Sequence, residues 1–467
     1  MRIKALKIKN FKGFANEIDI GLKGKNLVIY GENGSGKTSS VEALKLLFDS
    51  ASSEIGLEKY QNVFTKQPIE ISIETTNRSV ISLKTKKEAD KTNGKEKYVT
   101  LTDPEGYKER IFFEALSRST SILSYRQLMK IYDLSTPEDF YELFIRNIMA
   151  YYLIPPRREK TLIEELQELE ELKEKSPKSR KRIGKKEESI KREINKFFAE
   201  IKDTWNQYIQ TLTGDNIEIE CSLEKLGKLN FSVKWNGKDV SKILTFLNEG
   251  RLNAISLSLF LAYYKKFNVY KYKILLLDDV VIGLDMDLRI PLLKIIQEDF
   301  EDEYQIIITT FDENWFNLMK QCLKSTHEWE FVRLVVKATD NSNHPFIVGV
   351  VGQDYLKRAE DYLKNGDIPA AAIYTRLEFE RIVTKYAEKK RLKVAFRRKV
   401  QEIPMNEVWG EVKDKLPRAK TICRKVDTYK SILLNPAVHY DPRPKYKREI
   451  KYAIDVVEKL KEKIEEI

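Results

Sequence analysis

Eight residues near the start of the chain have the types and spacing of a phosphate-binding loop. Residues 31–38 are Gly-Glu-Asn-Gly-Ser-Gly-Lys-Thr and fit the pattern G-x-x-x-x-G-K-[ST]. Glycines let backbone N–H groups curl around phosphates, and the N-terminus of a following helix adds partial positive charge. We expect Lys37 to reach the terminal phosphates of a nucleotide and the Thr38 hydroxyl to bind Mg²⁺. The candidate nucleotide-binding residues here are Gly31, Asn33, Gly34, Ser35, Gly36, Lys37, Thr38 and Ser39.

A pair of aspartates much later in the chain could complete this site. Asp278 and Asp279 follow Lys-Ile-Leu-Leu-Leu at 273–277, which is typical of a buried strand. In open α/β sheets, ligands bind beyond the carboxyl ends of the strands. We therefore expect Asp278 to hold Mg²⁺, directly or through water. Asp279 is expected to orient or deprotonate an attacking water, so that Asp279 and Lys37 are the candidate catalytic residues.

The hydrophobic pattern around these residues predicts an α/β fold. Residues 2–30 predict two strands joined by a turn, and the apolar face of 37–48 predicts a helix directly after the loop. Short alternating runs within 68–102 predict antiparallel strands around a charged loop. Further buried strands are expected at 272–277 and 305–309.

Two other regions have a helical pattern. Residues 159–205 carry apolar stripes on both sides of a basic turn at 175–182, which predicts an antiparallel hairpin with arms of about 20 residues. This hairpin is either a solvated surface feature or a nucleic-acid or partner contact at its basic tip. Residues 354–467 predict a separate helical C-terminal domain.

Composition limits the class of protein. A length of 467 residues suggests two or three domains. The net charge of +12 fits either an anionic partner such as nucleic acid or a lysine-rich soluble chain. Three scattered cysteines argue against a disulfide framework or a zinc site. No apolar stretch approaches the ~20 residues that span a bilayer, and the N-terminus lacks a signal-peptide core, so we expect a cytoplasmic protein with no membrane partner.

Together the motifs resemble those of the RecF/SMC/Rad50 branch of ABC-type ATPases, over roughly residues 1–335. Residues 6–14, Leu-Lys-Ile-Lys-Asn-Phe-Lys-Gly-Phe, resemble the N-terminal strand and turn of that family. Residues 247–251, Leu-Asn-Glu-Gly-Arg, match its signature motif, with Asn248 in the place of serine. Gly-Leu-Asp at 283–285 matches its D-loop.

The resemblance implies a mechanism with ATP and Mg²⁺ as cofactors. Two copies, or a higher homo-oligomer, would sandwich ATP between their heads. Asn248 and Gly250 of one copy would contact the γ-phosphate held by the other, and Asp285 would belong to the same nucleotide site. ATP would then drive engagement and hydrolysis would release it. The glutamine loop of the family is placed within Tyr-Arg-Gln at 125–127.

The resemblance also organises the chain. It implies an N-terminal lobe of the head at 1–156, a short coiled-coil hairpin at 157–206, a C-terminal lobe at 207–350 and an all-α C-terminal domain at 351–467.

Three departures from the family pattern predict slow turnover. Asp279 stands where most ABC-type ATPases have glutamate. Phe311 occupies the third place of the switch region 309–312, where the family often has histidine, and it cannot hydrogen-bond a γ-phosphate through its side chain. Arg251 replaces an acidic or amide residue of the signature.

The C-terminal domain leaves several roles open. His439 lies in Asn-Pro-Ala-Val-His at 435–439, similar to segments in some RecF/SMC-like defence ATPases and faintly to the HEPN ribonuclease motif, although the arginine expected by that motif is missing. A structural or capping role, partner docking and RNA cleavage are the alternatives for His439. Arg376, Glu378 and Arg381 could line the same groove or sit on a solvated face.

Three functions are compatible with these features. The first is an ATPase sensor or clamp that controls a partner effector nuclease in antiviral defence, similar to the ATPase subunits of the Septu and PARIS systems. The second is a DNA-repair or recombination ATPase that binds DNA through its basic surface. The third is an ATP-regulated, HEPN-type ribonuclease toxin. The sequence favours the first, because no paired carboxylates with nuclease spacing are evident in the chain.

Overall fold

The computed structural model describes most of the chain, in two compact units, Met1–Val350 and Val351–Ile467. The described residues are 2–49, 58–85, 99–102, 120–124, 137–150, 152, 160–240, 247–268, 272–281, 284, 286–323, 328–338, 346–351, 355–393, 405–416, 419–430 and 446–466. Among them, no helix combines the length and the apolar character needed to cross a membrane.

The centre of the first unit is a six-stranded sheet with the order β14-β13-β3-β12-β11-β7. Strands β13, β3, β12, β11 and β7 are each parallel to their neighbours within this group. In β3, β11 and β12 the buried residues form near-continuous runs, as expected for strands covered on both faces. Because they are parallel, β3, β12, β11 and β7 end at one edge of the sheet. The strands are β3 (Asn26–Gly31), β7 (Thr120–Ser124), β11 (Ile274–Asp278), β12 (Gln305–Thr310), β13 (Trp329–Ala338) and β14 (Phe346–Val351).

A second, antiparallel sheet has the order β2-β1-β4-β5-β6. Residues 2–30 therefore contribute three strands rather than the expected two. The additional strand is β2, in which Ile18 and Ile20 are buried and alternate with more exposed residues, so four residues suffice to pair with β1. The strands are β1 (Ile3–Lys9), β2 (Ile18–Gly21), β4 (Glu70–Thr75), β5 (Val80–Lys84) and β6 (Val99–Thr102).

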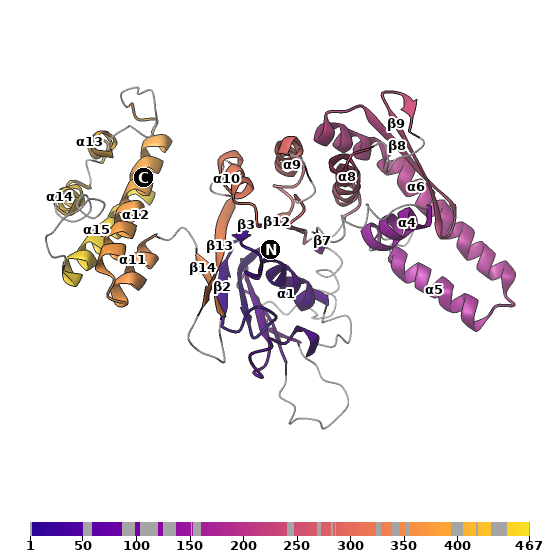
Figure 1. Cartoon of the computed structure of the whole chain (residues 1–467), viewed down its shortest axis with the longest axis horizontal. Coiled ribbons are helices and arrows are strands. Elements are labelled where there is room, and N and C mark those ends of the chain that lie inside the picture. Colours follow the sequence, from indigo (N-terminus) through magenta and orange to yellow (C-terminus); the bar gives the residue numbers. More distant parts are fainter. Residues whose placement is uncertain are drawn as a thin grey trace. The chain divides into compact units, whose positions relative to one another are not determined.

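Helix α1 (Lys37–Asp49) packs against both sheets (Figure 1). Its apolar side chains Val41, Leu44 and Leu47 belong to one buried cluster with Leu27 and Ile29 of β3. This packing fixes the N-terminus of α1 directly beyond the end of β3. A short 3₁₀ turn, η1 (Glu58–Tyr60), lies farther along the chain.

The remainder of the first unit is built around a long helix. Figure 1 shows α5 and the first part of α6 side by side as a hairpin, and α6 continues along the β8–β9 pair. Helix α8 packs on α6. The elements are α4 (Pro137–Tyr141), the π-helical turn η3 (Glu142–Ile148), α5 (Leu162–Lys175), α6 (Arg180–Thr213), β8 (Ile217–Lys225), β9 (Lys228–Trp235), β10 (Lys238–Asp239), α8 (Glu249–Phe267), α9 (Met286–Asp299) and α10 (Glu313–Cys322).

The two hairpin helices are not the equal arms of about 20 residues that the sequence pattern predicts. Helix α5 has 14 residues, because it begins at a capping box on Thr161 and ends just before Pro177. Helix α6 has 34 residues and ends at Gly214, which adopts φ +68°. Its apolar stripe continues through Trp205 to Leu212, and this part packs on α8 and β8.

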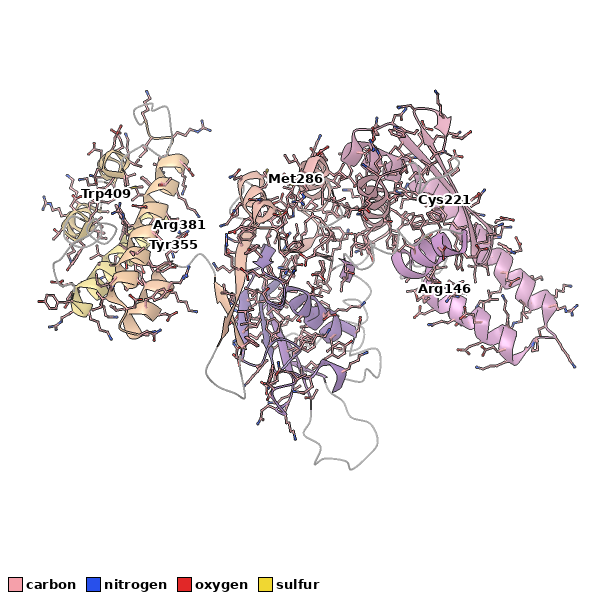
Figure 2. All side chains as sticks on the ribbon, in the orientation of Figure 1. Arg146, Cys221, Met286, Tyr355, Arg381 and Trp409 are labelled. Carbon is pink, nitrogen blue, oxygen red and sulfur yellow. The ribbon has the colours of Figure 1, made fainter. Side chains whose placement is uncertain are left out.

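In the second unit, every secondary-structure element described between Tyr355 and Glu465 is a helix. Trp409 lies among these helices (Figure 2) and is fully buried. Its indole N–H donates to Asp427 Oδ1 at 2.7 Å, and its ring meets Phe379 edge-on. This unit therefore has its own core. Its helices are α11 (Tyr355–Lys364), α12 (Ile368–Lys389), α13 (Met405–Asp414), α14 (Lys420–Tyr429) and α15 (Lys447–Glu465).

Candidate nucleotide site

The loop between β3 and α1 has a backbone that side chains would obstruct. Gly36 adopts φ +93°, and a Cβ atom there would lie 2.5 Å from the ring of Phe14. A Cβ atom on Gly31 would lie 2.2 Å from the Ser35 Oγ. Only glycine fits these two positions without displacing a neighbour. Asn33 and Gly34 are exposed at the turn of the loop, and Ser39 is half-buried in the first turn of α1. The loop can therefore present backbone N–H groups to an anion.

Lys37 is buried beneath this loop with few partners for its charge. Its side chain is only 5% exposed. Its Nζ donates to the Glu32 carbonyl oxygen at 3.2 Å and lies 3.9 Å from Asp279 Oδ2. Burial lowers the pKa of Lys37, while Asp279 and Asp278 act in the opposite direction. A buried ammonium with one carbonyl and one more distant carboxylate retains donor capacity for phosphate oxygens.

Asp278 lies at the carboxyl end of β11, against Thr38 and Thr309. The Thr38 Oγ1 donates to Asp278 Oδ1 at 3.3 Å, although the two residues are 240 positions apart. The Thr309 Oγ1 of β12 donates to the same oxygen at 2.6 Å. Burial raises the pKa of Asp278, and its hydrogen bonds with the two threonines oppose that shift. Carboxylate and hydroxyl oxygens are hard ligands of the kind Mg²⁺ binds, so Thr38 and Asp278 fit a magnesium ion.

Asp279 is the first residue after β11, and its carboxylate lies beside Lys37. It adopts φ +53°, a left-handed conformation that aspartate tolerates better than most residues. Its backbone N–H donates to the Thr309 Oγ1 at 3.1 Å, and its Oδ1 accepts a hydrogen bond from the Phe311 N–H at 3.0 Å. Burial raises the pKa of Asp279 to about 6, although Lys37 opposes the shift. A carboxyl group with this pKa can accept a proton from water near neutral pH.

The raised pKa of Asp279 gives a pH-dependent stability. The folded pKa is about 6, against about 3.9 in an unfolded chain. Below about pH 4 the group is protonated in both states and contributes nothing. As the pH rises from about 4 to 6, the unfolded chain releases the proton first, so ionising Asp279 lowers the stability of the folded chain. We expect ligand-free Asp279→Asn protein to be more stable than the parent by about 1–3 kcal/mol at neutral pH, with the gap closing below about pH 4.

Calorimetric unfolding of the full-length parent and Asp279→Asn proteins across this pH range, without nucleotide or magnesium, tests this expectation. A difference that does not change with pH, or an Asp279→Asn protein that is less stable at neutral pH, would contradict it.

Thr309 links the two acids, a role that no motif in the sequence assigns to it. Its fully buried hydroxyl donates to Asp278 and accepts from the backbone of Asp279. The available signal was a polar pair, Thr309-Thr310, directly after the apolar run Ile306–Ile308 in the strand next to the acidic one. The parallel register that sets Thr309 opposite Asp278 cannot be read from the sequence.

Replacing Thr309 by valine should misplace both acids. Thr309→Val keeps the shape of the side chain but leaves Asp278 without its shortest hydrogen bond, which costs about 1–3 kcal/mol of stability. We expect ATP hydrolysis to fall by about tenfold or more, with a higher magnesium requirement, and Thr309→Ser to restore both. Steady-state hydrolysis titrated with Mg²⁺ measures the effect. Parent-like rates and magnesium dependence in Thr309→Val would remove Thr309 from the site.

The signature residues are at the N-terminus of α8. This helix packs on α6 and α9, whereas the helix that follows the phosphate-binding loop is α1. Asn248 is the N-cap, and its Oδ1 accepts a hydrogen bond from the Arg251 N–H at 3.0 Å. Gly250 is buried in the first turn. The Arg251 Nε donates to Asp215 Oδ2 at 2.6 Å, and the guanidinium lies over the ring of Trp235. Arg251 thus supports the helix start from the side, which accounts for an arginine in this place.

An ion pair joins α9 to the switch region, residues 309–312. Arg289 Nη1 lies 2.5 Å from Asp312 Oδ2, and Asp312 also caps α10 by accepting a hydrogen bond from the Trp315 N–H at 3.0 Å. No motif in the sequence points to Arg289. Asp285, residues 125–127 and His439 lie outside the described residues. Among the described residues, no group of three or more His, Cys, Asp and Glu could hold a metal ion.

Glu378 corrects one expectation for the C-terminal unit. Its side chain is fully buried rather than on a solvated face. Two cations compensate the charge: the Arg381 Nε donates to Glu378 Oε2 at 2.7 Å, and Lys461 Nζ on α15 lies 3.7 Å from Oε1. A buried carboxylate needs such partners. Arg376 pairs instead with Glu380 on the same helix.

A family model described as the RecF/RecN/SMC N terminal domain matches residues 2–332, which is more than two thirds of the chain. The chain belongs to this family. The resemblance read from the motifs is thus confirmed at the level of the family, and the first unit is an ABC-type ATPase head of the RecF/RecN/SMC kind with mixed sheets and helices. ATP and Mg²⁺ are the ligands that heads of this family use. No curated protein matches the chain.

Several solved SMC heads are similar to this RecF/RecN/SMC-type chain. An SMC head bound to the C-terminal winged-helix domain of ScpA is 15% identical, with a TM-score of 0.46 over 75% of this chain and 98% of that one. An SMC head domain from Thermotoga maritima is 16% identical, with a TM-score of 0.38 over 75% and 99% of the two chains. An SMC head with an extended coiled coil, bound to the C-terminal domain of ScpA derived from Pyrococcus furiosus, is 17% identical, with a TM-score of 0.43 over 78% and 99%.

Proposed function

We propose that this chain binds Mg-ATP at the edge of the parallel sheet, hydrolyses it slowly, and closes as a head-to-tail homodimer or higher homo-oligomer, with ATP sandwiched between the heads, while ATP is bound. The observation that carries the proposal is the meeting of the Thr38 hydroxyl with Asp278 at 3.3 Å, beside the buried Lys37. Lys37 would hold the terminal phosphates, and Thr38 with Asp278 would hold the metal. When bound, the magnesium ion neutralises charge on the phosphate oxygens.

The geometry of Asp279 supports a slow reaction. Its carboxylate is held by the Phe311 N–H and lies 3.9 Å from Lys37. Asp279 would orient a water and take its proton, but an aspartate reaches less far than a glutamate. Phe311 is 40% exposed and offers a γ-phosphate only an apolar ring. We therefore expect a turnover well below the median of about 10 s⁻¹ for enzymes, measured by steady-state phosphate release.

The N-terminus of α8 supports closure across two copies. Asn248 begins a helix whose free N–H groups and dipole suit a phosphate, and Asn248 and Gly250 of one copy would meet the γ-phosphate held by the other. Asp285 of the D-loop belongs to the same proposal.

Substitution of Asn248 tests closure without disturbing the fold. Asn248→Asp retains an N-cap acceptor but sets a negative charge against the γ-phosphate, whereas Asn248→Ser retains the cap without charge. We expect both variants to bind ATP at their own loops, and only Asn248→Asp to lose ATP-dependent dimerisation in light scattering. Equal dimerisation of the two variants would contradict the role of α8.

We further propose that the ATP cycle controls a partner effector, a nuclease in antiviral defence, through the C-terminal unit. The support is that residues 351–467 form a separate compact helical unit with its own core, beyond the residues that match the family model. A nuclease encoded next to this chain should change its cleavage rate on addition of Mg-ATP and this chain. The same rate with and without the chain would contradict this role.

A further inference from the structure

The tip of the hairpin between α5 and α6 concentrates positive charge. From Lys175 to Lys186 the chain has seven basic residues and no acidic one. Five of the seven are exposed and have no ion-pair or hydrogen-bond partner for their side chains in this fully described hairpin. These five, called the tip cations below, are Lys178, Arg180, Lys181, Arg182 and Lys185.

The body of the same hairpin is different, because most of its cations are paired with carboxylates. Lys173 lies 2.6 Å from Glu187 across the pair of helices, and Lys186 lies 2.8 Å from Glu168. Lys175 pairs with Glu171 one turn away at 2.8 Å. A hairpin whose charges served only solubility would continue this pairing to its end. The change from paired to unpaired cations occurs where the hairpin turns.

Three of the tip cations also occupy positions where a positive charge destabilises the start of α6. Arg180, Lys181 and Arg182 form the first turn of α6, where the helix dipole favours acidic residues and disfavours cations. The N-cap residue, Ser179, makes no side-chain hydrogen bond to the helix. Sites at which a sequence breaks a local rule without an evident structural gain are often functional. An anion at this turn would meet both the cations and the free end of the helix.

The chemistry of the tip selects among possible partners. Its exposed side chains include no aromatic or large apolar residue, so it lacks the anchors of a protein interface and the apolar face that inserts into a membrane. Arg180 and Arg182 are of a type that can contact guanine, but the tip lacks the asparagine or glutamine that reads adenine and the carboxylate that reads cytosine. The property that its exposed side chains share is positive charge, which suits a regular array of phosphates contacted without regard to sequence.

We propose that the hairpin tip binds the sugar-phosphate backbone of nucleic acid, independently of sequence, through the five tip cations. This contact lies outside the ATP site and does not depend on the function proposed for that site.

The test replaces all five tip cations by glutamine in the full-length chain. A matched control replaces five exposed cations that have no side-chain partner and are scattered over both units: Lys66, Lys225, Lys238, Lys415 and Lys425. Both variants lower the formal net charge from +12 to +7. Fluorescence anisotropy of a labelled duplex DNA and of a labelled single strand, without nucleotide, gives affinity at about 50 and about 200 mM salt.

The parent should bind both probes with a strong dependence on salt. The tip variant should lose at least about tenfold in affinity at low salt, and its log–log salt slope should be shallower by up to about 4.5, since each lost phosphate contact removes about 0.9 for duplex DNA. The control variant should stay close to the parent. The tip variant should melt at the same temperature as the parent or higher, because unfavourable charges leave the start of α6.

Three results would overturn the proposal. In the first, the tip variant binds as the parent does. In the second, both variants lose affinity equally, which would make net charge the cause. In the third, the parent binds anionic phosphatidylserine vesicles but neither nucleic-acid probe, which would make the tip a membrane contact. Parent-like ATP binding in the tip variant shows that the head is folded and keeps this test separate from that of the ATP site.

Discussion

Lys37→Ala protein should bind ATP far more weakly than the parent. The ammonium is 5% exposed and lies beneath a loop that offers backbone N–H groups. Its contacts are the Glu32 carbonyl, the more distant Asp279 carboxylate and the ring of Phe311. Truncating one partner of a buried charge pair costs about 2–5 kcal/mol. At about 1.4 kcal/mol for each factor of ten, that is a loss in affinity of about 30-fold to a few thousand-fold. Isothermal titration with Mg-ATP measures it directly.

Lys45→Ala is the matched control for this loss. Lys45 lies on the same helix, is exposed, and has no partner for its side chain. Its replacement should leave ATP affinity unchanged. Tight ATP binding by the Lys37→Ala protein would show that the phosphates are held elsewhere.

Asp279→Asn should separate hydrolysis from binding. The amide keeps the size of the side chain and can still accept the hydrogen bond from the Phe311 N–H. It cannot take a proton from water, and positioned general bases contribute about 10²–10⁴-fold. We expect turnover to fall by about that factor while ATP affinity stays near that of the parent. Single-turnover phosphate release with ATP binding measured in parallel provides both values.

Asp302→Asn is the corresponding control, because Asp302 is an exposed acid away from the site. It should hydrolyse ATP at the parent rate. Undiminished hydrolysis by Asp279→Asn would assign the base to another residue, and loss of ATP binding would make Asp279 a structural partner of Lys37 instead.

The sequence predicts the parts of the head that rest on local rules. A glycine-rich turn between an apolar strand and an amphipathic helix has one common use, and β3, the loop and α1 occur where that pattern places them. The strand that ends in Asp278 is apolar throughout, which predicts a buried parallel strand.

The sequence does not predict the register between paired strands or the length of α6. Thr309 faces Asp278 only because β11 and β12 pair in one particular register. The length of α6 depends on α8 and β8, which cover its second half, and no pattern within 159–205 contains that information. Glu378 is buried on α12, which packs against α15, and α15 brings Lys461 within 3.7 Å of it. Each of these depends on tertiary contacts rather than on propensity.

The most direct test of the central claim, that bound ATP closes two heads on each other, is the mass of the Asp279→Asn protein in solution. One chain has a mass of 54.7 kDa. Light scattering coupled to size exclusion should show the mass of the ligand-free assembly double when Mg-ATP is added, and return when EDTA removes the magnesium. An unchanged mass in a sample that has bound one ATP per chain would contradict the account.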